Sequence, residues 1–271
     1  MSKKINFIIF SGLFIFLVLL TLGGLISYFK KNLTLKETKE QKELMEQTSK
    51  EQLFEKIKFT TEDGVEIVGD YYENKDSKYA GILIHMMPAD KSSFKDLASK
   101  LKSAGYTLLA IDLRGHGESI NSTKGLLDYK RFTDQEHQSS IYDIKSASSF
   151  LESKGFPIEK QFLIGASIGA NLSLQFLSMN PKIKAAILLS PGLNYRGIKI
   201  EDFLKKELGD KLLVIVTKGD AQSYPSVNKI KEIAPSSTIL EYQGDSHGTD
   251  ILKQFPEIYD KIIFFLKEKL L

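Results

Sequence analysis

The sequence predicts an α/β fold in which helices cover both faces of a mostly parallel sheet. Three observations carry this prediction. Short apolar runs, typical of buried strands, alternate with segments of helical periodicity over residues 80–266. A strand hairpin precedes them. One of the runs, Phe162–Ile164, leads into Gly165-Ala166-Ser167-Ile168-Gly169, a pattern typical of a sharp turn from a strand into a helix.

The first elements of this fold follow from local patterns. Residues 54–60 and 65–72 alternate in the manner of strands, and Asp63-Gly64 between them is a strong turn signal, so they predict an antiparallel hairpin. An apolar strand over residues 80–85 and a second one over residues 107–113 enclose a helical segment, residues 92–104. Strand, helix and strand at this spacing predict a crossover between parallel strands.

The same alternation continues to the C-terminus. Thr133 and Glu136 fit a capping box, and the apolar residues after them recur at helical spacing until Gly155. The strand that ends at Ile164 follows. The remaining predicted elements are a helix over residues 172–180, strands over 185–189 and 214–216, a helix over 227–233, a strand over 239–242 and a helix over 258–266.

The first 52 residues differ in composition from this domain, which we expect over residues 53–271. Residues 5–28 are almost entirely apolar, and as a helix they can cross roughly 30 Å of hydrocarbon. No small-residue cleavage site is evident, which favours an uncleaved signal anchor and transmembrane helix over residues 1–31. Residues 32–52 are rich in Lys, Glu and Gln and predict a polar linker. Lysines on both sides of the span leave its orientation open, and the layout resembles bacterial signal-anchored proteins with an exported domain.

Composition excludes several classes of function. The 37 basic and 34 acidic residues are interspersed, which disfavours nucleic acid as a partner. The absence of cysteine excludes disulfides, thiolate metal ligands and a cysteine nucleophile. No spacing of histidines and carboxylates suggests a metal site, and no glycine-rich motif suggests a nucleotide. We therefore expect neither a cofactor nor a metal.

Ser167 is the candidate nucleophile, because a residue at a strand-to-helix corner is strained and projects its hydroxyl above the sheet. A serine hydroxyl needs a base, and the base needs an acid that fixes its tautomer. His247 lies in a turn-rich loop after the last strand, and Asp220 follows the preceding strand at the same edge. Asp245 is less suitable because it is only two residues from His247. The alternatives are a packing turn at Ser167, a surface His247 and a helix cap at Asp220.

The hairpin, the parallel core, the Gly-x-Ser-x-Gly pattern and the order Ser, Asp, His together resemble the α/β-hydrolase fold over residues 53–271. Two further segments match. Asp112-Leu113-Arg114-Gly115-His116-Gly117-Glu118-Ser119 is similar to the Asp-x-Arg-Gly-x-Gly-x-Ser loop of many esterases and lipases. His85, followed by Met86-Met87-Pro88, occupies the place of the family's His-Gly oxyanion loop.

This resemblance implies a role for each candidate residue. Ser167 would be the nucleophile, His247 the base and then the acid, and Asp220 its orienting partner. The backbone N–H groups of Ile168 and Met87 would form the oxyanion hole. Met86 departs from the family, which usually has glycine there, and its side chain restricts the loop that carries the second donor.

The other histidines are expected to be structural or exposed. His85 and His116 would brace loops beside the pocket, as such histidines do in the family. His137 falls on the polar face of a predicted helix, so we expect it to be exposed to solvent. Only about twenty residues separate Leu189 from Lys211, which predicts no large lid and an open, small pocket.

The resemblance implies a serine hydrolase, similar to carboxylesterases and dienelactone hydrolases, that cleaves a small carboxylic ester through an acyl-enzyme. Short acyl groups or soluble esters suit the small pocket, and thioesters or amides are variants of the same chemistry. The alternative is a membrane-anchored binding or scaffold protein that keeps the fold without turnover. Met86 and the apolar N-terminal segment motivate this alternative.

Overall fold

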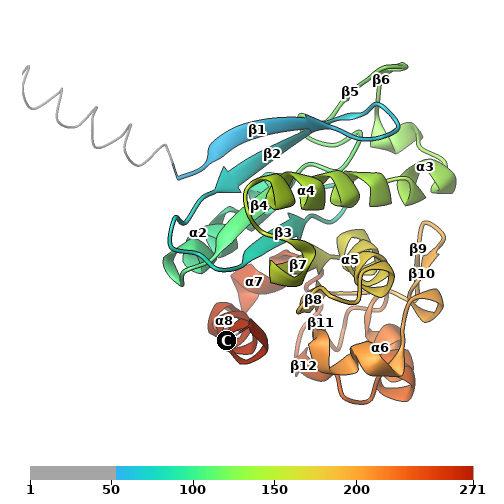
Figure 1. The fold of residues 1–271 in the computed structure, drawn as a ribbon. Helices are drawn as coiled ribbons and strands as arrows, with labels where there is room; N and C mark the ends of the chain where they lie inside the picture. Colours follow the sequence, from blue (N-terminus) through green and yellow to red (C-terminus); the bar gives the residue numbers. More distant parts are fainter. Residues whose placement is uncertain (1–52, 271) are drawn as a thin grey trace, which may run out of the picture. The chain divides into compact units, whose positions relative to one another are not determined.

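An eight-stranded sheet forms the centre of the computed structural model, which describes residues 53–270 (Figure 1). Its strand order is β1-β2-β4-β3-β7-β8-β11-β12. The strand β2 pairs antiparallel with both β1 and β4, and the other pairs are parallel. The strands are β1 (Glu55–Thr60), β2 (Glu66–Tyr72), β3 (Ala80–Ile84), β4 (Thr107–Ile111), β7 (Gln161–Ala166), β8 (Ala186–Leu189), β11 (Leu212–Thr217) and β12 (Thr238–Tyr242).

Helices cover both faces of this sheet. The helices α4 and α5 lie side by side against one face and, together with α6, share one buried apolar cluster, whereas α2 and α8 share a second cluster on the other face (Figure 1). The helices are α2 (Lys95–Ser103), α3 (Asp134–Gln138), α4 (Ile141–Ser153), α5 (Ile168–Met179), α6 (Tyr224–Ile233), α7 (Asp250–Gln254) and α8 (Ile258–Leu270). The predicted α/β class with a mostly parallel sheet is confirmed.

Short elements fill the connections between the strands. The hairpins are β5 (Asn121–Ser122) with β6 (Gly125–Leu126), and β9 (Asn194–Tyr195) with β10 (Ile198–Lys199). The 3-10 turns are Lys91–Phe94, Tyr129–Arg131, Ile158–Lys160, Ile200–Asp202 and Lys206–Lys211. Between β8 and β11 the chain therefore forms only the hairpin β9–β10 and two 3-10 turns.

The predicted helix after Thr133 is in fact two helices. Thr133 and Glu136 form the expected capping box at the start of α3. This helix ends at Gln138, and α4 begins at Ile141 with a buried face that includes Ile144. The apolar periodicity begins only with α4, since α3 is built entirely of polar residues, so the capping box and the periodic segment belong to different helices.

The corner between β7 and α5 explains both glycines of the serine motif. A Cβ atom on Gly165 would overlap the carbonyl oxygen of Gly169, and one on Gly169 would overlap the carbonyl oxygen of Ile84 in β3. Buried backbone cannot move aside without breaking sheet hydrogen bonds. The chain can therefore turn this tightly only with glycine at both positions.

The predicted anchor, residues 1–31, and linker, residues 32–52, lie outside the described residues. Within residues 53–270, no helix combines the length and the apolar character needed to cross a membrane. The residues from Phe54 onward form one compact unit.

Asp70 gives the sheet a pH-dependent stability. It lies on β2 opposite Lys56 of β1, and its Oδ1 is buried without a hydrogen-bond partner among residues 53–270. Burial raises the pKa of Asp70 to about 6, from an ordinary value of 3.8, against the opposing charge of Lys91. Between pH 4 and 6, Asp70 is thus protonated in the folded protein and ionised in the unfolded chain. The free energy of unfolding therefore falls as the pH rises from about 4 through 6.

We therefore expect Asp70→Asn to gain about 2 kcal/mol of stability relative to the wild type between pH 4.5 and pH 7.5. Urea unfolding at the two pH values measures this difference. Asp76→Asn, at an exposed aspartate, is the matched control and should change little at either pH. An Asp70→Asn effect equal at both pH values would contradict a raised pKa.

Candidate active site

Three residues from separate loops meet at the carboxyl edge of the parallel strands. Ser167 lies between β7 and α5, Asp220 follows β11, and His247 follows β12. The His247 Nε2 is 2.8 Å from the Ser167 Oγ, and the His247 Nδ1 is 2.7 Å from the Asp220 Oδ2. The structure thus brings together the three predicted site side chains in one hydrogen-bonded chain.

Ser167 has the strained backbone expected of a corner residue. Its φ is +54° and its ψ is −119°, a backbone conformation that residues other than glycine rarely adopt. The Ser167 N–H donates to the carbonyl oxygen of Leu189 in β8, which ties the corner to the neighbouring strand. Only 7% of the residue is exposed. The hydroxyl is therefore held in one place above the sheet rather than free to rotate away.

Asp220 is a buried acid that is kept ionised. Its Oδ1 accepts hydrogen bonds from the N–H groups of Gln222 and Ser223, while Oδ2 faces His247. Burial raises the pKa of Asp220, but hydrogen bonds from His247, Ser223 and Ser190, with the charge of His247, outweigh this and hold the pKa below its ordinary value. A carboxylate at this position favours the tautomer with the proton on His247 Nδ1, which leaves Nε2 free to accept the Ser167 proton.

The histidine loop is fastened to the end of β11 and to the residue that follows β8. The Gly248 N–H donates to the Ser190 Oγ at 2.9 Å, and the Thr217 Oγ1 donates to the carbonyl oxygen of Ser246 at 2.8 Å. Asp245, the alternative acid, is exposed. These contacts fix the position of His247 from both sides of the loop.

The two expected oxyanion donors both have free N–H groups. Within residues 53–270, neither the Met87 N–H nor the Ile168 N–H donates to a protein acceptor. Ile168 begins α5, where the first N–H groups of a helix have no intrahelical partner and the dipole favours negative charge. Neither N–H group is thus occupied by an acceptor from the described part of the chain.

His85 holds the peptide group that carries the Met87 N–H. Its Nδ1 lies 2.8 Å from the carbonyl oxygen of Met86, and its Nε2 accepts the Leu113 N–H at 2.9 Å. These partners require a neutral ring with the proton on Nδ1, and burial lowers the His85 pKa accordingly. Because Met86 C=O and Met87 N–H belong to one planar peptide unit, this bond also sets the direction of the N–H.

The Met86 side chain packs against the histidine loop. A Cβ atom on Gly248 would overlap the Met86 Sδ, and Gly248 has a positive φ of 56°. The side chain also contacts the apolar cluster on the α2 and α8 face of the sheet. Met86 therefore links the loop that follows β3 to the loop of His247.

Sequence reasoning missed three hydroxyl residues around this centre. Ser190 follows β8 with φ +52° and is fully buried. Ser223 and Tyr195 form a 2.8 Å hydrogen bond beside His247. The sequence did hold a signal for Ser190, because it directly follows the predicted strand over residues 185–189 and so lies at the same sheet edge as the candidate site.

His116 and His137 are both buried. His116 stacks on Tyr129 and meets His85 edge to face, which agrees with a bracing role. The expectation that His137 is exposed was wrong, because it is only 2% exposed and packs against Phe132. Phe132, in the segment before α3, covers the face of α3 that the sequence pattern predicts to be polar.

The loop over residues 112–119 ties elements together. Asp112 accepts hydrogen bonds from the Lys91 N–H, the Lys91 ammonium and the Glu118 N–H. The Arg114 guanidinium pairs with Asp143 of α4 and with Asp63 of the β1–β2 turn. The charged groups of this motif therefore join Lys91, α4 and the β1–β2 turn to one another.

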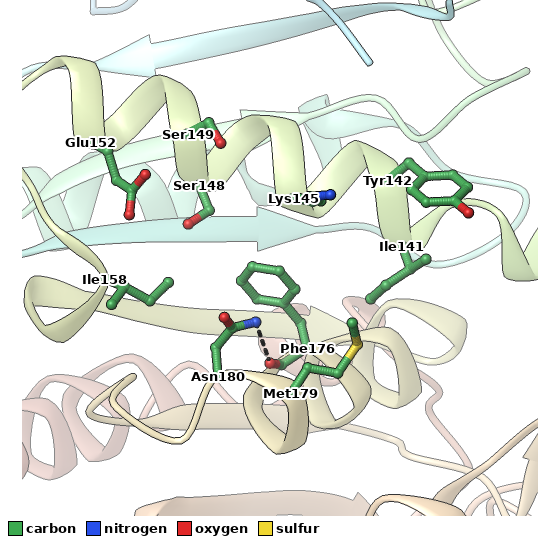
Figure 2. A pocket seen from close by; sticks show the side chains of 10 residues that line it. All are labelled: Ile141, Tyr142, Lys145, Ser148, Ser149, Glu152, Ile158, Phe176, Met179 and Asn180. Carbon is green, nitrogen blue, oxygen red and sulfur yellow. Dashed lines mark hydrogen bonds between the residues drawn. The ribbon is translucent and has the colours of Figure 1, made fainter. Parts of the chain in front are cut away.

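A cavity of about 350 Å³ lies away from this centre, between α4 and α5 (Figure 2). Phe176 points from α5 toward α4, and Ile141, Ile158 and Met179 complete its apolar part. Its lining includes none of Ser167, Asp220 and His247. The cavity is therefore separate from the candidate active site.

Comparisons with known proteins agree with this architecture. A family model described as serine aminopeptidase, S33, matches residues 76–229, more than half of the chain. An esterase of Pyrococcus furiosus superposes with a TM-score of 0.65 at 21% identity, over 80% of this chain and 91% of the other.

Two further solved structures have the same fold. A Rhodococcus esterase superposes with a TM-score of 0.60 at 16% identity, over 79% of this chain and 99% of the other. A CIB-like hydrolase of Thermoplasma acidophilum has a TM-score of 0.60 at 17% identity, with the same coverage. No curated protein sequence matches the chain.

Proposed function

The chain belongs to the serine aminopeptidase S33 family of α/β hydrolases, and from this premise we propose that it is a serine hydrolase that cleaves a small carboxylic ester. The observation that carries the proposal is the continuous hydrogen-bonded chain from Ser167 through His247 to Asp220. In a buried serine with a base at 2.8 Å, the hydroxyl proton has a defined acceptor, as nucleophilic attack requires.

In the proposed acylation step, the Ser167 Oγ attacks the ester carbonyl carbon as its proton moves to His247 Nε2. The carbonyl π electrons move to the oxygen, which the N–H groups of Ile168 and Met87 would stabilise. Asp220 stabilises the resulting imidazolium. When the tetrahedral intermediate collapses, the bond to the leaving oxygen breaks and His247 gives that oxygen its proton.

Deacylation repeats these steps with water as the nucleophile. His247 takes a proton from water, the hydroxide oxygen bonds to the acyl carbon, and Ser167 leaves with the proton that His247 returns. The sum is one ester and one water giving one acid and one alcohol. Protons in the proposed cycle move between Ser167, His247, the leaving oxygen and water.

The substrate is proposed to have a small acyl group. Between β8 and β11 the chain forms only the hairpin β9–β10 and two 3-10 turns, which supports an open pocket. The family's description names an aminopeptidase, so an amide is the second candidate substrate. A panel of short-chain 4-nitrophenyl esters with an aminoacyl 4-nitroanilide separates the two, and we expect turnover of the esters.

We also propose that residues 1–31 anchor the protein in a membrane and that residues 32–52 link this anchor to the domain, with the domain outside the cytoplasm. The support is the long apolar run over residues 5–28. Protease treatment of intact cells should degrade the domain. Protection of the domain until the cells are lysed would contradict this topology.

Labelling by a fluorophosphonate probe tests the reaction directly. We expect one probe per chain, attached within the tryptic peptide that contains Ser167. Ester turnover should fall in proportion to the fraction of protein that is labelled. The reason is that such probes report an activated serine rather than a particular substrate. Folded wild-type protein that stays unlabelled and hydrolyses none of the esters would instead support a binding or scaffold protein on this fold.

A further inference from the structure

Tyr195 is held at the active site by the element that follows β8. It lies on the hairpin β9–β10, and its ring meets that of His247 nearly edge to face, with centroids 6.2 Å apart at 78°. A Cβ atom on Gly192 would overlap the ring, so this glycine leaves the space that the phenol fills. The Tyr195 side chain is partly buried against the apolar cluster below.

Asn171 fixes this hairpin to the nucleophile helix. Asn171 is fully buried on α5, and its amide nitrogen donates to the carbonyl oxygens of Gly192 and Ile198 at 2.9 and 2.8 Å. Its amide oxygen accepts the Gly192 N–H. Because α5 begins directly after Ser167, Tyr195 and the nucleophile are positioned by one rigid unit.

The Tyr195 hydroxyl lies 2.8 Å from the Ser223 hydroxyl, beside the His247 ring. The Ser223 Oγ lies 3.1 Å from the carbonyl oxygen of Ser190, which can only accept, and 3.3 Å from the His247 Nδ1. In the 2.8 Å pair of Tyr195 Oη and Ser223 Oγ, either oxygen can be the donor, so the Tyr195 proton can turn toward a substrate. Burial raises the pKa of Tyr195, so the phenol keeps this proton at neutral and mildly alkaline pH.

Tyr195 and Met87 follow strands on opposite sides of β7, the strand that leads into Ser167. In the sheet, β7 lies between β3 and β8, and Met87 follows β3 whereas Tyr195 follows β8. The Tyr195 ring contacts that of His247, whose Nε2 lies 2.8 Å from the Ser167 Oγ. His247 must protonate the leaving group, so the leaving group lies near His247 when the oxyanion faces Met87. Tyr195 contacts His247 and therefore borders the same region.

We propose that Tyr195 is a further catalytic residue, whose hydroxyl donates a hydrogen bond to the leaving-group oxygen of the substrate during acylation. This inference rests on the proposed ester hydrolysis. As the C–O bond breaks, negative charge grows on the leaving oxygen, and the Tyr195 O–H turns to it from Ser223. His247 supplies the proton that the alcohol keeps, so Tyr195 ends the step with its own proton.

The test uses Tyr195→Phe in the full-length protein, which removes the hydroxyl and keeps the ring. The substrates are 4-nitrophenyl, phenyl and ethyl acetate, which share an acyl group and have increasingly basic leaving groups. A more basic leaving oxygen carries more charge that needs a donor. We expect kcat/KM to fall by about 10- to 100-fold for ethyl acetate and by less than about threefold for 4-nitrophenyl acetate.

Fluorophosphonate labelling of the variant checks that its active site is intact. The matched control is Tyr142→Phe, at a tyrosine in the lining of the separate cavity, which should leave kcat/KM for all three esters unchanged. Equal losses for the three esters, or no loss, in a variant that still labels would overturn the role of Tyr195 alone. A wild type that hydrolyses none of the three would overturn the proposed function and this inference together. A loss that grows with leaving-group basicity supports the role.

Discussion

Replacing Ser167 by alanine is expected to abolish fluorophosphonate labelling and to lower kcat for ester hydrolysis by about 10⁶-fold. The hydroxyl is the only group at this corner that can form the acyl-enzyme, and its base lies 2.8 Å away. Alanine fits the site without a clash, because the corner already holds a Cβ atom. Labelling and initial rates with 4-nitrophenyl acetate, measured side by side, give the two readouts.

Ser173→Ala is the matched control for that experiment. Ser173 is a buried serine further along α5, and its hydroxyl donates to the carbonyl oxygen of Gly169 rather than to a histidine. We expect it to label normally and to keep its turnover within a few-fold of the wild type. Turnover retained by Ser167→Ala would show that another residue is the nucleophile.

Local patterns predicted the strands and the serine corner because the signals there are strong. Buried parallel strands such as β7 are continuous apolar runs, and a tight corner needs glycine at two fixed positions. The meeting of Ser167, Asp220 and His247 was predicted from topology, since the carboxyl ends of parallel strands share one edge of the sheet.

The contacts that sequence reasoning missed depend on packing between distant segments. His137 lies on a face of α3 that periodicity marks as polar, and only the fold brings Phe132 against it. Tyr195 reaches His247 across more than fifty residues of sequence, through a hairpin that Asn171 anchors. No local pattern distinguishes such a tyrosine from any other loop residue.

Met86 is a further case in which the structure changes an interpretation. From the sequence, a side chain in place of glycine raised doubt about the second oxyanion donor. In the structure the side chain packs on Gly248, while His85 holds the Met86 carbonyl group. The neighbouring Met87 N–H is therefore oriented from its own peptide unit, and the Met86 side chain supports the histidine loop.

Asp220→Asn is expected to lower kcat by about 10⁴-fold while leaving labelling slow but detectable. The asparagine amide can keep the 2.7 Å contact with His247 Nδ1, but if its NH₂ group faces the ring, Nδ1 must accept and the proton moves to Nε2. A protonated Nε2 cannot take the Ser167 proton. The effect is thus on the tautomer of His247 rather than on its position, and a comparison of labelling rates with steady-state kcat measures it.

Asp245→Asn is the control that separates the two candidate acids, because Asp245 is exposed on the same loop as His247. Its activity should stay within a few-fold of the wild type. If Asp245→Asn lost activity and Asp220→Asn did not, the acid would be misassigned. Asp220 has the stronger case because its carboxylate is buried and holds two backbone N–H groups as well as His247. An acid fixed in this way can keep one histidine tautomer through every step of the cycle, whereas an exposed loop aspartate cannot.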